Sequence, residues 1–195
     1  MSLKKFIKKT AAKVVKSPIQ IDFEKGGERR VMEVAPYPKE VFWDESVTIH
    51  QTKEGVEYVR TPDSQFENLS GFDFQPNYIE IDGLRMHYLD EGPKDGQIIL
   101  MLHGQPVWCY LYRKMIPLLT AQGYRCIAPD MIGMGRSDKP IKEQYHIYDK
   151  HCDLILQFIQ QLKLKNITCF IQDWGSVIGA RLVGENPDLF ARVIL

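Results

Sequence analysis

Short apolar runs that alternate with helix-like segments constrain the fold of this chain more than any other feature. The runs cover residues 97–102, 124–128 and 167–172, and another begins at 192–195. Unbroken apolar runs of this length are typical of strands buried on both faces. Strands that alternate with helices of about a dozen residues form a mostly parallel sheet with helices on both faces. The pattern therefore predicts an α/β fold, which we expect to be incomplete at the C-terminus because the alternation stops at residue 195.

The segment before these runs has a different period. Residues 78–82 and 84–90 alternate between apolar and polar side chains around Asp82-Gly83. Because such a dipeptide favours a tight hairpin turn, we expect two antiparallel strands that lead into the parallel sheet. Helices are predicted from Trp108 to about Gln122, across 147–162, and from the residues after Asp173 to about Glu185, where Asn186-Pro187 would end the last one.

The N-terminal part of the chain carries weaker signals. Residues 1–16 contain lysine as the only charged residue type, and apolar residues such as Phe6, Ile7 and Val14 recur at helical spacing. This describes a basic amphipathic leader, which either attaches weakly to an anionic membrane surface or stays solvated. Residues 17–75 show no sustained period, so we interpret them as an N-terminal extension of unknown role. The regular signals occupy residues 76–195.

Composition narrows the class of partner. Lys plus Arg equals Asp plus Glu at 25 each, so no overall field favours nucleic acid. The cysteines stand singly, without the paired spacing of a zinc or redox site, and we expect reduced core thiols in a cytoplasmic protein. Apart from the leader's possible membrane contact, nothing points to a membrane, because no apolar run approaches the ~18 residues of a transmembrane helix.

One acidic residue stands where chemistry is expected. Asp173 follows a buried strand and precedes a helix, and ligands of parallel sheets bind at the carboxyl ends of the strands. A sharp strand-to-helix turn would expose its carboxylate as a nucleophile. Such turns favour small residues two positions before and two after the nucleophile; Gly175 fits and Ile171 does not. The competing interpretation is that Asp173 caps the helix.

Other conspicuous residues are interpreted as structural. His103 is expected to hold its turn by hydrogen bonds, and the Gly133-x-Gly135 turn lacks the third glycine and the lysine of nucleotide-binding motifs. Trp108 belongs to the core of its helix and is a candidate for lining a pocket. The remaining histidines at positions 50, 87, 146 and 151 belong to no motif, and no metal or cofactor is implied.

Four linked motifs resemble the haloalkane dehalogenases, enzymes of the α/β-hydrolase fold. They are PNYIEIDGLRMHYLDEGP at 76–93, HGQPVWCYLYRKMIPLL at 103–119, RCIAPDMIGMGRSDKP at 125–140 and FIQDWGS at 170–176. Their order and spacing match the family over roughly residues 60–195. Within the family, Ile in place of the small residue before the nucleophile is also found, so Ile171 fits the resemblance.

The resemblance implies a hydrolase that cleaves carbon–halogen bonds and gives an alcohol and halide. Asp173 would be the catalytic nucleophile, and Trp174 would donate its indole N–H to the departing halide. Gln105 would be a second halide donor, and the backbone N–H groups of Gln105 and Trp174 would form an oxyanion hole. The implied partners are a small apolar halogenated substrate and water, and the implied role is detoxification. A carboxylate is needed because attack on an sp3 carbon then gives an ester, which water can cleave.

The chain departs from the family pattern in two respects. Gln105 occupies a position that more usually holds Asn or Glu; its amide still donates a hydrogen bond but reaches further. The cap, the catalytic acid and the catalytic histidine that the resemblance implies would lie beyond residue 195. We therefore expect residues 1–195 to be a fragment that is inactive alone.

Alternatives stay open at this point. An epoxide hydrolase shares the Asp-Trp-Gly turn and the ester route, although it usually has an aromatic residue at the position of Gln105. A luciferase-like relative of the dehalogenases is a more distant option. From a different class, the chain could be a truncated, non-catalytic membrane-surface protein that uses residues 1–16.

Overall fold

The computed structural model describes residues 19–25, 28–34 and 47–195, and it divides the chain into two units, 1–47 and 48–195. In the first unit, β1 (Ile19–Lys25) pairs antiparallel with β2 (Glu28–Val34), with Ile19 opposite Val34 and Lys25 opposite Glu28. The leader predicted over residues 1–16 lies outside the described residues. Our division at residues 16 and 75 therefore stays a prediction.

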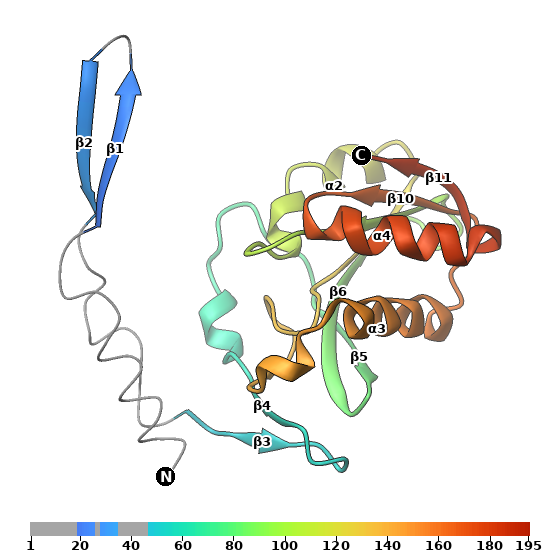
Figure 1. Cartoon of the computed structure of the whole chain (residues 1–195). Coiled ribbons are helices and arrows are strands. Elements are labelled where there is room, and N and C mark those ends of the chain that lie inside the picture. Colours follow the sequence, from blue (N-terminus) through green and yellow to red (C-terminus); the bar gives the residue numbers. More distant parts are fainter. Residues whose placement is uncertain (1–18, 26–27, 35–46) are drawn as a thin grey trace. The chain divides into compact units, whose positions relative to one another are not determined.

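The second unit is built on a six-stranded sheet in the order β11-β10-β7-β8-β6-β5 (Figure 1). The strands β7, β8, β10 and β11 run parallel, and β6 and β5 are antiparallel to their neighbours. This confirms the mostly parallel sheet predicted from the sequence. The bounds are Asn77–Ile81 for β5, Leu84–Glu91 for β6, Ile98–Leu102 for β7, Arg125–Pro129 for β8, Ile167–Ile171 for β10 and Phe190–Ile194 for β11.

The β5–β6 hairpin is confirmed, together with its turn. Asp82 and Gly83 both have positive φ, at 53° and 71°. A two-residue hairpin turn of the type that matches strand twist requires positive φ at both positions, which glycine adopts without cost and aspartate tolerates.

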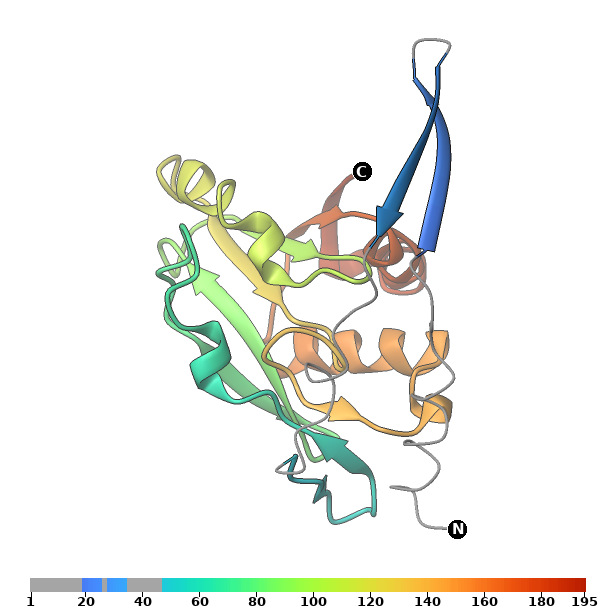
Figure 2. The ribbon, with the colours of Figure 1, turned by 90° about the vertical axis from the view of Figure 1, so that its left-hand side faces the viewer.

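Helices cover both faces of the sheet (Figures 1 and 2). The helices α3 (Tyr148–Gln161) and α4 (Trp174–Glu185) lie together on one face, and the 3-10 helix η3 (Cys109–Tyr112) and α2 (Ile116–Thr120) lie on the other. The single helix predicted across 108–122 is therefore wrong. Pro117 stands near the start of α2, where its missing N–H does no harm, but it could not continue a helix arriving from η3.

Two cores explain why the strands read as unbroken apolar runs. Along β7, Leu100 and Leu102 pack into the core beneath α3 and α4, whereas Ile99 and Met101 pack into the core beneath η3 and α2. Successive side chains of a strand point to opposite faces, so a strand covered on both faces is apolar at every position.

A small three-stranded sheet lies beside the turn that follows β8. It has the order β3-β4-β9 and contains β3 (His50–Gln51), β4 (Glu57–Val59) and β9 (Lys139–Pro140). Next to β4, Arg60 donates two hydrogen bonds to the buried carboxylate of Asp138, at 2.7 and 2.8 Å. Short 3-10 helices η2 (Asp63–Phe66), η4 (Glu143–Tyr145) and η5 (Pro187–Leu189) complete the unit.

The four cysteines, Cys109, Cys126, Cys152 and Cys169, are free and buried, as predicted. Within the part of the chain that the structure describes, no helix has both the length and the apolar character needed to cross a membrane.

Candidate active site

Two loops leave the sheet side by side because their strands are neighbours. The strands β7 and β10 pair in parallel, with Leu102 opposite Ile171, so both loops begin at the same edge. The backbone N–H of Gln105, on the first loop, donates a 2.9 Å hydrogen bond to Oδ1 of Asp173, on the second. The structure thus brings together the two residues that the sequence placed at neighbouring strand ends.

Asp173 has the backbone conformation of a sharp turn. Its φ is 52° and its ψ is −127°, a region that residues other than glycine rarely occupy. The side chain is exposed and makes no capping hydrogen bond to α4, although the residue stands at the N-cap position. Asp173 therefore occupies the cap position without a capping hydrogen bond from its side chain, and its Oδ1 accepts the N–H of Gln105 from the other loop.

Glycines allow the two loops and α4 to approach this closely. A Cβ atom on Gly104 would overlap Oδ1 of Asp173, and one on Gly175 would overlap the carbonyl oxygen of Leu102. A Cβ on Gly179 would stand 2.5 Å from Cγ2 of Ile171. Ile171, two positions before Asp173, is therefore accommodated by Gly179, one helical turn after Gly175 in α4. Inspection of the residues adjacent to Asp173 could not reveal this fit.

The local hydrogen bonds favour the ionised form of Asp173. The backbone N–H of Gln105, and secondarily that of Trp174, lowers the pKa of the Asp173 carboxyl below its usual value. Donors that point at a carboxylate stabilise its charge. The carboxylate is therefore ionised at neutral pH, and two backbone N–H groups are directed at it.

A cleft of about 590 Å³ lies next to these loops, although Asp173 itself is not one of its lining residues. Gln105 and Trp174 both line the cleft, and the Trp174 side chain is 49% exposed. Trp108 does not contribute to this wall; it lines a separate hollow of about 330 Å³ with Pro106 and Leu111. The remaining lining residues of the cleft are Pro106, Met131, Ile132, Gly133, Met134, Gly135, Lys139, His146, Tyr148, His151 and Ile178.

Two histidines and a lysine on the cleft wall were not found by sequence reasoning, because none belongs to a motif. His146 stacks on His151 with ring centroids 5.8 Å apart. Burial, with a smaller contribution from His146, lowers the pKa of His151 to about 4. Burial likewise lowers the pKa of Lys139 to about 8, and its Nζ donates to the carbonyls of Gly135 and Ser137. His151 is therefore uncharged at neutral pH.

His103 is structural, as predicted. Its Nδ1 bonds the carbonyl oxygen of Gly104 at 2.8 Å, and its Nε2 accepts the backbone N–H of Met131 at 3.0 Å. Burial lowers the pKa of His103, which favours the neutral ring that this pair of bonds needs. Both ring nitrogens are occupied, so His103 has no free nitrogen to act as a base.

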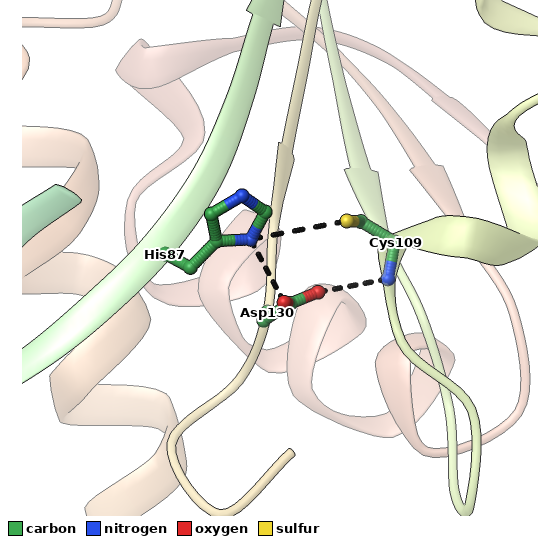
Figure 3. Close-up of side chains that lie close together, drawn as sticks. All are labelled: His87, Cys109 and Asp130. Carbon is green, nitrogen blue, oxygen red and sulfur yellow. Dashed lines mark hydrogen bonds and ion pairs between the residues drawn. The ribbon is translucent and has the colours of Figure 1, made fainter. Parts of the chain in front are cut away.

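A buried cluster behind the site has the composition of a metal centre. The ligand atoms of His87, Cys109 and Asp130 lie within 4.8 Å of one another (Figure 3). However, both oxygens of the Asp130 carboxylate already accept N–H donors, from Cys109 on Oδ1 and from His87 and Arg136 on Oδ2. The Asp130 carboxylate is therefore satisfied, and a metal ion would have to displace three donors from it, although Nε2 of His87 is buried without a hydrogen-bond partner.

The fold and the site define a class of protein: an α/β hydrolase with an acidic residue at its strand-to-helix turn. Residues 97–195 match the family described as alpha/beta hydrolase fold, and the chain belongs to that family.

Among proteins of this fold, the similarity is to haloalkane dehalogenases. The chain is 55% identical over 143 residues to the haloalkane dehalogenase of Psychrobacter cryohalolentis, an alignment that covers 71% of this chain and 47% of the relative. It is 48% identical over 145 residues to that of Mycobacterium marinum, with 72% and 49% covered. These relatives confirm the resemblance seen in the motifs. The chain spans about half the length of the curated relatives it matches.

Two solved structures also resemble this chain, a haloalkane dehalogenase and an epoxide hydrolase. A haloalkane dehalogenase from Paraglaciecola agarilytica superposes with a TM-score of 0.69 at 42% identity, covering 72% of this chain and 48% of that one. An epoxide hydrolase from Vigna radiata superposes with a TM-score of 0.57 at 28% identity, covering 62% and 37%.

Proposed function

We propose that this chain is the N-terminal part of a haloalkane dehalogenase-like hydrolase, with Asp173 as its nucleophile. The observation that carries the proposal is the exposed carboxylate of Asp173, held in a strained turn with the N–H of Gln105 on one oxygen and Trp174 beside it. The similarity to dehalogenases supports the choice of an alkyl halide as substrate.

In the first step, an oxygen of Asp173 attacks the carbon that bears the halogen. The carbon–halogen bond breaks, its electron pair leaves with the halide, and an alkyl ester forms. Because Oδ1 is held by Gln105, attack by Oδ2 leaves Oδ1 as the ester carbonyl oxygen. That oxygen already faces the donor needed when the ester is hydrolysed, and a preorganised donor costs no rearrangement. The indole N–H of Trp174 and the amide of Gln105 would receive the halide.

Hydrolysis of the ester needs a base that activates water. His103 cannot serve, since both of its ring nitrogens are engaged, and none of the histidines in the described residues makes a hydrogen bond to Asp173. We therefore expect residues 1–195 to perform the first step at most, with release of one halide per chain and no sustained turnover.

Mass spectrometry after incubation with 1-bromobutane tests the proposal. One butyl group should be added to the chain, on the peptide that contains Asp173. Asp173→Asn should abolish the adduct, because a neutral amide is a poor nucleophile. The control Asp188→Asn changes an exposed aspartate elsewhere and should retain it. An adduct at another residue would overturn the assignment, and an adduct from styrene oxide but not from 1-bromobutane would move the protein to the epoxide hydrolases.

Halide binding gives an independent test. Chloride or bromide should quench tryptophan fluorescence, and Trp174→Phe should lower halide affinity. Unchanged affinity in that variant would remove Trp174 from its role.

The free, buried thiols support a cytoplasmic location, where a detoxifying enzyme would meet its substrate. Membrane contact through residues 1–16 is tested by co-sedimentation with anionic vesicles, with and without that segment. Equal sedimentation of the two forms would exclude the contact.

A further inference from the structure

The loop that carries Gln105 is pinned at both ends to a single dipeptide. At its start, Nε2 of His103 accepts the backbone N–H of Met131 at 3.0 Å. At its end, the backbone N–H of Cys109 donates to Oδ1 of Asp130 at 2.8 Å. Asp130 and Met131 are consecutive and follow β8 directly. The position of the loop therefore depends on two groups outside it: the N–H of Met131, which donates to its start, and the carboxylate of Asp130, which accepts from its end.

Asp130 is itself held in one orientation. Its Oδ2 accepts from Nδ1 of His87 at 2.8 Å (Figure 3). The same oxygen accepts from the backbone N–H of Arg136 at 2.9 Å. The backbone N–H of Asp130 donates to the carbonyl of His87 at 2.8 Å. With Oδ2 occupied by two donors, Oδ1 can point only toward the end of the loop.

The buried carboxylate also stays charged. Burial alone would raise the pKa of the Asp130 carboxyl, but the hydrogen bond from His87, together with that from the Cys109 N–H, holds the pKa below its usual value. A hydrogen bond to an ionised acceptor is roughly twice as strong as one between neutral groups. The Cys109 N–H is buried, so without this acceptor it would have to move toward water or remain unsatisfied.

We propose that Asp130, oriented by His87, is a positioning residue that sets the direction of the Gln105 N–H toward Asp173. The argument is geometric: only residues 104–108 separate the two anchors, and Gly104 packs directly against Asp173. A shift at Cys109 is therefore transmitted to Gln105. The effect on catalysis rests on the proposed function, whereas the effect on the Gln105–Asp173 hydrogen bond does not.

A variant that lacks the thiol of Cys109 distinguishes this positioning role from a metal site. Asp130 is bonded to the backbone of Cys109, so Cys109→Ala keeps that hydrogen bond, loses only the weak 4.0 Å contact between Sγ and Nδ1 of His87, and removes the only sulfur ligand of the cluster. A metal centre would be lost in that variant, but the positioning network would not.

The test follows two signals in the purified chain by NMR: the carboxyl carbon of Asp173 and the backbone amide proton of Gln105, each titrated with pH. In the wild type, the amide should titrate with Asp173, whose pKa lies below the usual aspartate value. Asp130→Asn and His87→Leu should raise the pKa of Asp173 by about half a unit or more and reduce the response of the amide. His87→Asn should rescue both signals, because its Nδ2 donor occupies the place of Nδ1.

Two controls separate positioning from general destabilisation. Cys109→Ala should leave both signals at their wild-type values. Phe158→Leu, in the core under α3, should lower thermal stability without moving either signal. If Asp130→Asn does not fold, the His87→Leu and His87→Asn pair decides the question.

Unchanged signals in folded Asp130→Asn and His87→Leu would overturn the inference, and so would changes of equal size in Phe158→Leu. Loss of the signals in Cys109→Ala would point to the thiol instead of the backbone. If the wild type shows the coupled titration but forms no alkyl adduct, the proposed function fails and the positioning role stands.

Discussion

The contact between Ile171 and Gly179 can be measured by a double-mutant cycle. Gly179→Ala places a Cβ atom 2.5 Å from Cγ2 of Ile171, and an overlap of this kind costs about 1–3 kcal/mol. Alanine inside a helix gains about 1 kcal/mol over glycine, so the net change should be a loss of up to about 2 kcal/mol. Ile171→Ala alone should cost about 2–5 kcal/mol, because the side chain is buried.

In the double variant the overlap disappears and the helix gain remains. The other contacts of the new Cβ begin at 3.4 Å, which is ordinary packing. The double variant should therefore be more stable than the sum of the single changes by about 1–3 kcal/mol, well outside the roughly 0.5 kcal/mol scatter of independent sites. Urea unfolding measures all four proteins. Gly184 lies in the same helix, and a Cβ atom added there would meet no atom within 4 Å. Gly184→Ala should therefore stabilise the protein slightly and show no coupling to Ile171→Ala. Additivity in the Ile171–Gly179 pair would refute the reasoning.

Three further results are expected. The free energy of unfolding should fall as the pH drops from 6.5 toward 4, since unfolded chains protonate His151 before the folded protein does, and His151→Asn should flatten this slope in urea titrations. Arg60→Ala should destabilise by about 3 kcal/mol, the lower end for a broken buried pair because Arg60 is partly exposed. Arg60→Lys keeps the charge but not the two-pronged donor, so it should recover only part of this loss, and full stability of that variant would contradict the bidentate contact with Asp138. No cysteine should react with a thiol reagent at pH 8 before unfolding, since burial disfavours the thiolates and raises the pKa of Cys126 to about 11.

The strands and the hairpin were predictable because each has a local cause. The turn at Asp82 and Gly83 depends on two adjacent residues, and β7 and β10 read as apolar at every position because helices cover both faces. The pairing of Asp173 with Gln105 followed from the rule that parallel strands end at one edge, and the structure agrees.

The rest depended on contacts between distant segments. The helix predicted over 108–122 ignored Pro117, whose effect is local and could have been recognised. The fit of Ile171 against Gly179 links a strand to the second turn of a helix, and the histidines on the cleft wall come from the segment before α3 and from α3 itself. The Ile171–Gly179 contact and the cleft histidines follow no regular spacing along the chain. They therefore leave no periodic signal in the sequence.

With Asp173 as the proposed nucleophile, its backbone sets a conflict between selection for stability and selection for activity. A residue other than glycine held at φ 52° and ψ −127° costs about 1–3 kcal/mol. Asp173→Gly would recover that energy while removing the carboxylate. A library screened only for heat resistance should therefore enrich glycine at position 173, whereas one screened for alkylation should exclude it. Position 173 would then mark where thermal robustness and reactivity are in direct competition.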